Sequence, residues 1–227
     1  MKSYDANKAL ISLHIPKAGG TSLGNILRQW YGGNFHQHYC DEKNNRKPPR
    51  HDLRPGACIH GHFNARRGFG VRDYYPEAGQ FITMLRDPFE IVVSRFFYEK
   101  QRASRQESFR DGKPLVLPPD INQYLEGEIL KADYHPNLLD YMPAEMTPDN
   151  FKDVVQSSFI YIGIMEDFDL SVVKLSERLG KPLQPLQHLN PAERFAAAET
   201  RYKIIFMEAH PLEYALYNYV LENYKHW

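Results

Sequence analysis

The apolar residues of this chain gather in short runs that alternate with segments of helical periodicity. The runs end at polar, glycine or proline turns, which is typical of buried strands. They cover residues 9–15, 57–63, 80–85 and 159–165. Strands that alternate with helices predict a parallel sheet with helices on both of its faces. The expected fold class is therefore α/β.

Helices are predicted where apolar residues recur three and four positions apart and where the ends carry start and stop signals. The first follows residues 9–15 and ends at Gly32, a common helix terminator. Another begins with the pair Asp87 and Pro88, a cap followed by a favoured first residue. A helix closed by Gly180 follows the last strand, and one or two more end the chain.

Two segments do not fit the alternation of strands and helices. Residues 33–55 are polar, basic and proline-containing, and they predict a loop. Residues 104–150 are rich in proline and polar groups, and they predict a mostly helical or irregular insertion. The whole chain, residues 1–227, is predicted to be a single domain.

Charge is balanced overall but unevenly distributed along the chain. The net charge is 0, with 28 basic and 28 acidic residues. Residues 41–72 contain eight Lys or Arg against three Asp or Glu, whereas residues 120–180 contain four against twelve. The first region would attract an anionic ligand, although many charge runs are only solvated faces. This distribution does not indicate a nucleic-acid-binding protein.

The cysteines and the apolar runs exclude several classes of protein. Cys40 and Cys58 cannot form a disulfide framework or a CxxC metal site. The opening MKSYDANKAL is too polar for a signal peptide, and the apolar runs are too short to span a bilayer. We therefore expect a cytoplasmic protein with no stable membrane insertion.

The sequence PKAGGTS joins the first strand to the first helix and has the composition of an anion-binding turn. Glycines let the backbone approach phosphate oxygens, and the start of a helix favours an anion. The ordinary alternative is a strand-to-helix turn with a solvated lysine. The turn is not a Walker A loop, because no lysine precedes Thr21. The candidate anion-binding residues, and hence the candidate cofactor-binding residues, are Lys17, Ala18, Gly19, Gly20, Thr21 and Ser22.

Two strings resemble the donor motifs of sulfotransferases that use 3′-phosphoadenosine 5′-phosphosulfate (PAPS). HIPKAGGTSL resembles the 5′-phosphosulfate loop, which implies a P-loop-like three-layer domain and contact between Lys17 and the transferring group. LRDPFEIVVSRFFY resembles the 3′-phosphate motif, which implies that Arg86 and Ser94 bind the 3′-phosphate. Without this resemblance, Arg86 would be expected to pair with a carboxylate and Ser94 to be an incidental helix serine.

The string IHGHF resembles one in the uronyl 2-O-sulfotransferases, in which a histidine is the catalytic base. The resemblance favours His62 as the base and His60 as a supporting or substrate-binding group. We expect the two side chains to point to opposite sides of the strand end. A metal site is not expected, because no third ligand is evident. IGIMEDFD resembles the strand and acidic turn of the same branch, and HLNP lies where the family closes over the donor.

The resemblance implies transfer of a sulfuryl group from PAPS to a hydroxyl, on a carbohydrate or a small molecule, by in-line displacement. His62 would accept the proton of the hydroxyl, and Lys17 would stabilise the leaving group without a metal. The basic stretch with Arg66, Arg67 and Arg72 suits a carboxylated or sulfated acceptor, and Arg66 and Arg67 are the candidate substrate-binding residues. The insertion of residues 104–150 is available for acceptor binding.

Two alternatives remain open at this point. A P-loop-like nucleotide kinase would use Asp87 to bind magnesium, although the missing GK[ST] counts against it. A non-catalytic protein that binds nucleotides or sulfated glycans would keep Lys17 and Arg86 and would need no base.

Overall fold

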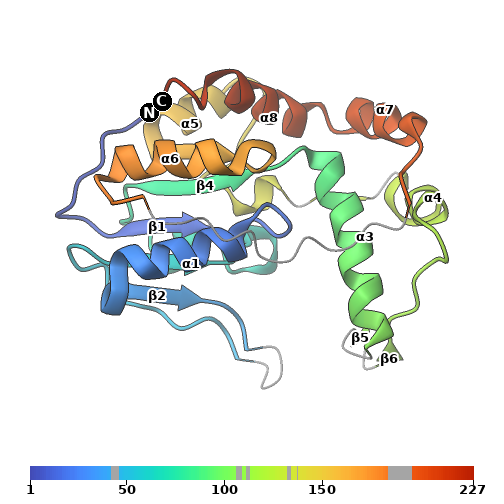
Figure 1. The fold of residues 1–227 in the computed structure, drawn as a ribbon, viewed down its shortest axis with the longest axis horizontal. Helices are drawn as coiled ribbons and strands as arrows, with labels where there is room; N and C mark the ends of the chain where they lie inside the picture. Colours follow the sequence, from blue (N-terminus) through green and yellow to red (C-terminus); the bar gives the residue numbers. More distant parts are fainter. Residues whose placement is uncertain (42–45, 106–108, 111–112, 132–133, 137, 184–195) are drawn as a thin grey trace.

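The computed structural model describes residues 1–41, 46–105, 109–110, 113–131, 134–136, 138–183 and 196–227. A five-stranded sheet lies at its centre, and every neighbouring pair of strands is parallel (Figure 1). The predicted parallel α/β sheet is therefore confirmed. In spatial order its strands are β2 (Phe35–His38), β3 (Cys58–Gly61), β1 (Leu10–Leu13), β4 (Phe81–Leu85) and β7 (Phe159–Ile164).

The edge strand β2 lies inside residues 33–55, so the prediction of a loop there is partly wrong. Its sequence FHQH contains one apolar residue, and only His38 is buried. An edge strand pairs on one side only, and β2 pairs with β3 alone. Its backbone hydrogen bonds hold it in the sheet without the continuous apolar run that marks a central strand.

Helices cover both faces of the sheet and make it the middle of three layers. On one face α1 (Gly20–Tyr31) and α6 (Phe168–Leu179) bury their apolar side chains against β1, β4 and β7. On the other face α5 (Phe151–Ser158) and α8 (Pro211–Asn223) do the same. Because each face has its own apolar cluster, nearly all strand residues are buried, as expected for a parallel sheet.

A third group of helices lies beyond the carboxyl ends of the strands. The long helix α3 (Pro88–Ser104) follows β4 and packs with α7 (Thr200–Ala209), α4 (Ile121–Tyr124) and the π-helical turn η4 (Leu125–Ile129). In Figure 1 the arrowheads of the sheet point towards this group. The carboxyl ends of parallel strands, where ligands bind in open α/β sheets, therefore lie between the sheet and α3.

The remaining elements are short. They are α2 (Val71–Tyr74), the 3₁₀ turns η1 (Gly32–Asn34), η3 (Ala65–Arg67), η5 (Leu139–Tyr141) and η6 (Met165–Asp167), and the paired β5 (Phe109–Arg110) and β6 (Lys113–Pro114). The chain ends lie close together at the opposite end from α3 (Figure 1). Among the described residues, no helix has the length and apolar character needed to cross a membrane.

Candidate active site

The turn between β1 and α1 has the backbone of an anion-binding loop. Lys17 and Gly19 both have positive φ angles, 65° and 77°, so the chain reverses sharply before α1 begins at Gly20. The first N–H groups of a helix have no carbonyl partner one turn earlier, and they form its positive end. The first turn of α1 contains no acidic residue to occupy them.

Three histidine rings form a stack beneath this loop. His14, which follows β1, has its ring centroid 4.3 Å from that of His62 and 5.1 Å from that of His60. Both rings therefore lie on the same side of the strand end, and the prediction of opposite sides is wrong. Residues two apart on a strand share a face, so His60 and His62 reach the same neighbour across the β1–β3 pair.

Gly20 is required by the close approach of the histidine stack. A Cβ atom at this position would lie less than 3 Å from Cγ, Cδ2 and Nε2 of His14. A Cβ at Gly24, one turn later on α1, would lie 2.9 Å from Nε2 of His60. The loop glycine thus lets the start of α1 rest directly on the rings. His14 and this contact were missed by the sequence analysis, because neighbouring strands bring them together.

Each ring of the stack has a different partner for its Nδ1 atom. His62 Nδ1 lies 2.7 Å from the backbone oxygen of His14, and His14 Nδ1 lies 2.8 Å from the hydroxyl of Tyr39. His60 Nδ1 lies 2.9 Å from Oγ of Ser12. A carbonyl oxygen only accepts hydrogen bonds, so Nδ1 of His62 carries the proton. A neutral His62 therefore has its basic lone pair on Nε2, the state that a general base needs.

Burial separates His60 from the other two histidines. His60 is 1% exposed, and burial lowers its pKa to about 3, so the ring is neutral. Burial also holds the pKa of His14 well below its ordinary value, with smaller contributions from His62 and His60. His62 and His14 are both partly exposed, and of these two only His62 has its Nδ1 at a carbonyl oxygen. This arrangement favours His62 as the base and His60 as a supporting group without substrate contact.

Lys17 lies beside α3 and is only partly hydrated. Its Nζ atom is 3.9 Å from the ring centroid of Tyr98, within the range of a cation–π contact. Burial, followed by the nearby Arg86 guanidinium, lowers the pKa of Lys17 to about 8. Nη1 of Arg86 donates to the backbone oxygen of Lys17 at 3.0 Å. The loop is thereby tied to the strand end that carries Arg86.

The predicted 3′-phosphate pair lies at the start of α3. Arg86 is 17% exposed, and its Nη2 lies 3.5 Å from Oε2 of Glu90, one turn along the helix. Ser94 is buried a further turn along. Glu90 and Ser94 are four residues apart and therefore share one helix face. The joint role of Arg86 and Ser94 stays a prediction, and Glu90 would compete with a phosphate for Arg86.

Asp87 caps α3, as predicted. Its Oδ1 accepts hydrogen bonds from the backbone N–H groups of Phe89 (2.9 Å) and Glu90 (3.2 Å). Its Oδ2 forms an ion pair with Lys203 at 2.7 Å, and the Tyr214 hydroxyl donates to Oδ1. Because both carboxylate oxygens of Asp87 have protein partners, its position after β4 is explained by helix capping and an ion pair, without a bound metal. This weakens the kinase interpretation.

The acidic turn after β7 supports the same strand end. Oε1 of Glu166 accepts a hydrogen bond from the backbone N–H of Asp87 at 3.0 Å, and Oδ2 of Asp167 accepts one from the Tyr224 hydroxyl at 2.6 Å. The acidic residues of IGIMEDFD therefore join β7 to the start of α3 and to the end of α8. The HLNP string lies outside the described residues.

The basic residues after His62 divide into two kinds. Arg66 and Arg67 are exposed on η3, whose cap Asn64 accepts from the Arg67 backbone N–H at 2.9 Å. Arg72 instead donates to the backbone oxygens of Pro143 and Ala78, at 2.9 Å and 2.6 Å. Arg72 thus joins two loops of the protein through hydrogen bonds, and its contribution to an acceptor site stays a prediction.

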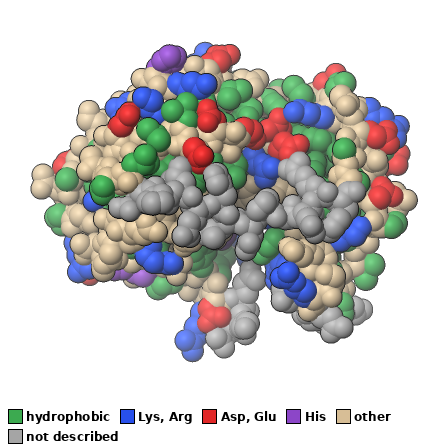
Figure 2. Space-filling model, in the orientation of Figure 1, with side chains coloured by type: hydrophobic (Ala, Val, Ile, Leu, Met, Phe, Trp, Pro, Cys, Tyr) green, Lys and Arg blue, Asp and Glu red, His purple; other side chains and the backbone are tan. Residues whose placement is uncertain are grey.

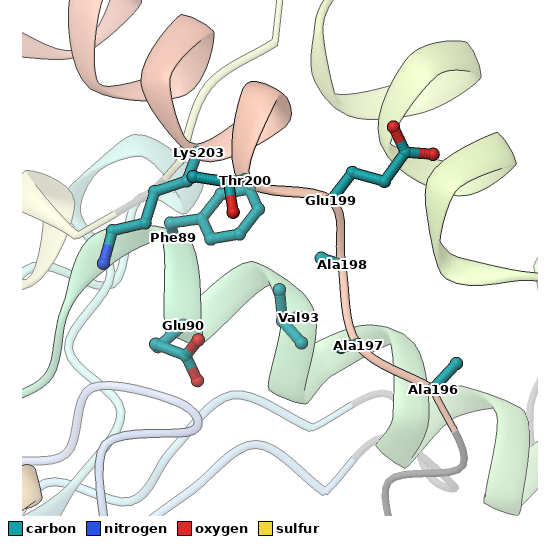
Figure 3. Close-up of a pocket in the computed structure, with 9 residues that line it drawn as sticks. All are labelled: Phe89, Glu90, Val93, Ala196, Ala197, Ala198, Glu199, Thr200 and Lys203. Atoms are coloured by element: carbon teal, nitrogen blue, oxygen red, sulfur yellow. The ribbon is translucent and has the colours of Figure 1, made fainter.

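A pocket of about 480 Å³ opens beside α3 (Figure 3). Phe89, Glu90 and Val93 line it from α3, and Thr200 and Lys203 line it from α7. Residues 196–199 complete the wall. Glu90 links the pocket to Arg86, so it adjoins the predicted 3′-phosphate site. In the described part of the chain, no group of three or more His, Cys, Asp or Glu side chains is arranged to hold a metal ion.

Comparison with solved structures agrees with this architecture. The crystal structure of mouse sulfotransferase SULT7A1 complexed with PAP matches with a TM-score of 0.54 and 14% sequence identity. The match covers 97% of this chain and 90% of that one. The chain has a sulfotransferase fold. No protein-family model matches the sequence, and a search of curated proteins finds no match. The P-loop-like three-layer prediction is confirmed.

Proposed function

We propose that this protein is a PAPS-dependent O-sulfotransferase. One observation carries the proposal: a partly exposed His62 lies next to the turn between β1 and α1, which is suited to bind an anion. The Nδ1–H of His62 donates a hydrogen bond to the His14 carbonyl. A histidine base and a sulfate-binding loop are joined through the ring of His14, which touches both. A protein that only binds nucleotides has no need for a histidine held in the basic tautomer.

In the proposed reaction the acceptor hydroxyl oxygen attacks sulfur and its proton moves to Nε2 of His62. The bond between sulfur and the bridging phosphate oxygen breaks, and its electron pair stays on the 5′-phosphate of 3′-phosphoadenosine 5′-phosphate (PAP). Lys17 and the N–H groups at the start of α1 stabilise that developing charge. Arg86 adds a positive charge behind the loop through its bond to the Lys17 carbonyl.

The other end of the donor is assigned to the start of α3. Arg86 and Ser94 would bind the 3′-phosphate, and the adjoining pocket would receive the purine. The aromatic ring of Phe89 and the apolar Val93 suit an uncharged base, whereas Glu90 and Glu199 disfavour a phosphate inside the pocket. The acceptor class is a hydroxyl compound, and a saccharide remains a proposal that rests on the IHGHF string.

Thermal denaturation with PAP, in a buffer that contains a metal chelator, tests the donor assignment. PAP should raise the melting temperature, because a ligand of the native state stabilises it by mass action. AMP lacks the 3′-phosphate and should raise it much less, and Arg86→Gln should reduce the difference between the two. Equal shifts from PAP and AMP would refute the 3′-phosphate assignment. A shift that appears only with ATP and magnesium would favour the kinase.

A further inference from the structure

The backbone of Lys17 has a conformation that is unusual for a residue with a side chain. Its φ angle is 65°, and among the described residues it is the only one other than glycine with a positive φ. Such a conformation is strained, persists only where the surrounding structure holds it, and clusters at functional sites. The contacts that hold Lys17 therefore bear on where its side chain can act.

Two residues of one segment hold the two ends of Lys17. Nη1 of Arg86, two residues before α3, donates to the Lys17 backbone oxygen at 3.0 Å. Nζ of Lys17 lies 3.9 Å from the centroid of the Tyr98 ring, further along α3. Because α3 buries Phe96, Phe97 and other apolar side chains in a packed cluster, the helix is a firm support. One segment thus fixes both the carbonyl and the ammonium of Lys17.

The ammonium of Lys17 faces an aromatic ring and not a carboxylate. Glu99, next to Tyr98, forms an ion pair with Arg102 at 3.7 Å, and no ion pair among the described residues includes Lys17. A π face attracts a cation without a full negative charge, so it would not compete with an anionic donor as a carboxylate would. An ammonium has three N–H donors, and those that point away from the ring remain available to an anion.

Tyr98 does not belong to the apolar cluster that anchors α3. Its side chain is 39% exposed, whereas the neighbouring Phe96 and Phe97 are buried in that cluster. Its ring has a second cationic neighbour in Arg102, whose guanidinium carbon lies 5.6 Å from the ring centroid. In Figure 2 an open recess separates the lower part of the sheet region from the α3 region, and Lys or Arg side chains are visible on both sides of it. Core packing therefore does not account for the exposed ring of Tyr98, whereas its contact with Lys17 does.

We propose that Tyr98 is a positioning residue that holds the Lys17 ammonium where the leaving group of the sulfuryl transfer develops negative charge. This inference rests on the proposed function, because it assigns the departing 5′-phosphate of PAP to Lys17. Tyr98 touches neither donor nor acceptor and acts through Lys17 alone. Arg86 fixes the backbone of the lysine and Tyr98 fixes its side chain before the donor arrives. A cation that is already in place needs less ordering at the moment of reaction than a mobile one.

Two substitutions at Tyr98 separate the role of the ring from that of the hydroxyl. Tyr98→Leu removes the π face and should lower kcat with PAPS by about 2- to 30-fold, the range expected for one cation–π contact. Tyr98→Phe keeps the ring and should stay within about twofold of the wild type. The KM for PAPS should change less than kcat, because Lys17 acts on charge that develops in the transition state. Full kcat in Tyr98→Leu, or equal losses in both variants, would overturn the inference.

A double-mutant cycle with Lys17→Met shows whether Tyr98 acts through Lys17. In the Lys17→Met background, Tyr98→Leu should change kcat by no more than about twofold. A loss as large as that in the wild-type background would contradict the inference. The matched control is Tyr219→Leu, which removes a ring beneath a different lysine, Lys152, whose Nζ lies 5.5 Å from the ring centroid. Because this contact lies on α8, the control should leave kcat within about twofold, and melting temperatures establish that every variant is folded.

Nuclear magnetic resonance measures the contact without any activity. Reductive methylation with ¹³C-formaldehyde keeps the positive charge of lysine, and Lys17→Arg identifies the Lys17 signal by its absence. The ring current of residue 98 should shift this signal upfield in the wild type and in Tyr98→Phe, but not in Tyr98→Leu. A wild-type signal at the position of an exposed lysine would refute the contact itself. An upfield signal in a protein that transfers no sulfuryl group would refute the proposed function, which keeps the two failures distinct.

Discussion

Replacing Gly20 with alanine should destabilise the protein through the ring of His14. The new methyl group would lie less than 3 Å from three atoms of that ring. The ring cannot easily move away, because it is stacked on His60 and His62 and its Nδ1 is bonded to Tyr39. Overpacking of this kind costs about 1–3 kcal/mol, against a helix-propensity gain of at most about 1 kcal/mol. A net cost of about 1–2 kcal/mol, at about 2–4 °C per kcal/mol for a chain of this length, should lower the melting temperature by roughly 2–8 °C.

A double-mutant cycle identifies the source of that loss. His14→Ala removes the ring but keeps the backbone oxygen that positions His62, and the lost packing should cost about 2–4 kcal/mol by itself. In Gly20→Ala/His14→Ala the added methyl no longer meets the ring. The combined loss should therefore be smaller than the sum of the single losses by about 1–3 kcal/mol.

Urea denaturation of the four proteins measures the cycle. Gly33→Ala is the control, because a Cβ atom there would meet nothing within 4 Å, and its effect should stay within about 0.5 kcal/mol. Strict additivity, or a Gly20→Ala protein as stable as the wild type, would refute the close packing of the loop on the histidine stack.

Three further predictions follow from the charges around the site. Because the pKa of Lys17 is about 8, kcat/KM should fall as pH rises above about 8, and Lys17→Arg should move this fall to higher pH. A pH dependence of kcat/KM that Lys17→Arg leaves unchanged would argue against a charged Lys17 in catalysis. Glu90→Gln should tighten PAP binding about two- to tenfold, measured by calorimetry, because it frees Arg86 from a competing carboxylate. Unchanged affinity would argue against a contact between Arg86 and the 3′-phosphate. The pKa of His60 is lowered from 6.5 to about 3, so its ring stays neutral in the folded protein while the unfolded chain takes up a proton. The free energy of unfolding should therefore fall by up to about 1.4 kcal/mol per pH unit as pH drops from about 6.5 towards 3. In urea denaturation His60→Gln should flatten this pH dependence of stability, and an equally steep dependence would assign the acid sensitivity to other groups.

The sheet and its helices were predictable because their signals are local. Apolar runs such as 159–165 and helix boundaries such as Asp87 and Gly180 appear directly in the sequence, and the structure has β7, α3 and α6 at these positions. The edge strand β2 escaped prediction because backbone pairing with β3 holds it, and FHQH has no apolar pattern.

The surroundings of the predicted residues were not predictable in the same way. Lys17 and His62 stood out because short strings resemble known motifs. His14 lies beside His60 and His62 because of the register of β1 against β3, and Tyr39 reaches His14 from the residue after β2. Neither position can be predicted from a single segment of the sequence.

Turnover with ³⁵S-labelled PAPS tests the central claim most directly. Wild-type protein is incubated with labelled PAPS and a panel of hydroxyl acceptors that includes neutral and carboxylated sugars, and labelled products are separated from PAPS. We predict label on an acceptor, and a rate roughly 10²–10⁴-fold lower for His62→Ala with its PAP-induced melting shift retained. A protein that binds PAP yet transfers no label to any acceptor, or a His62→Ala variant with full activity, would contradict the account.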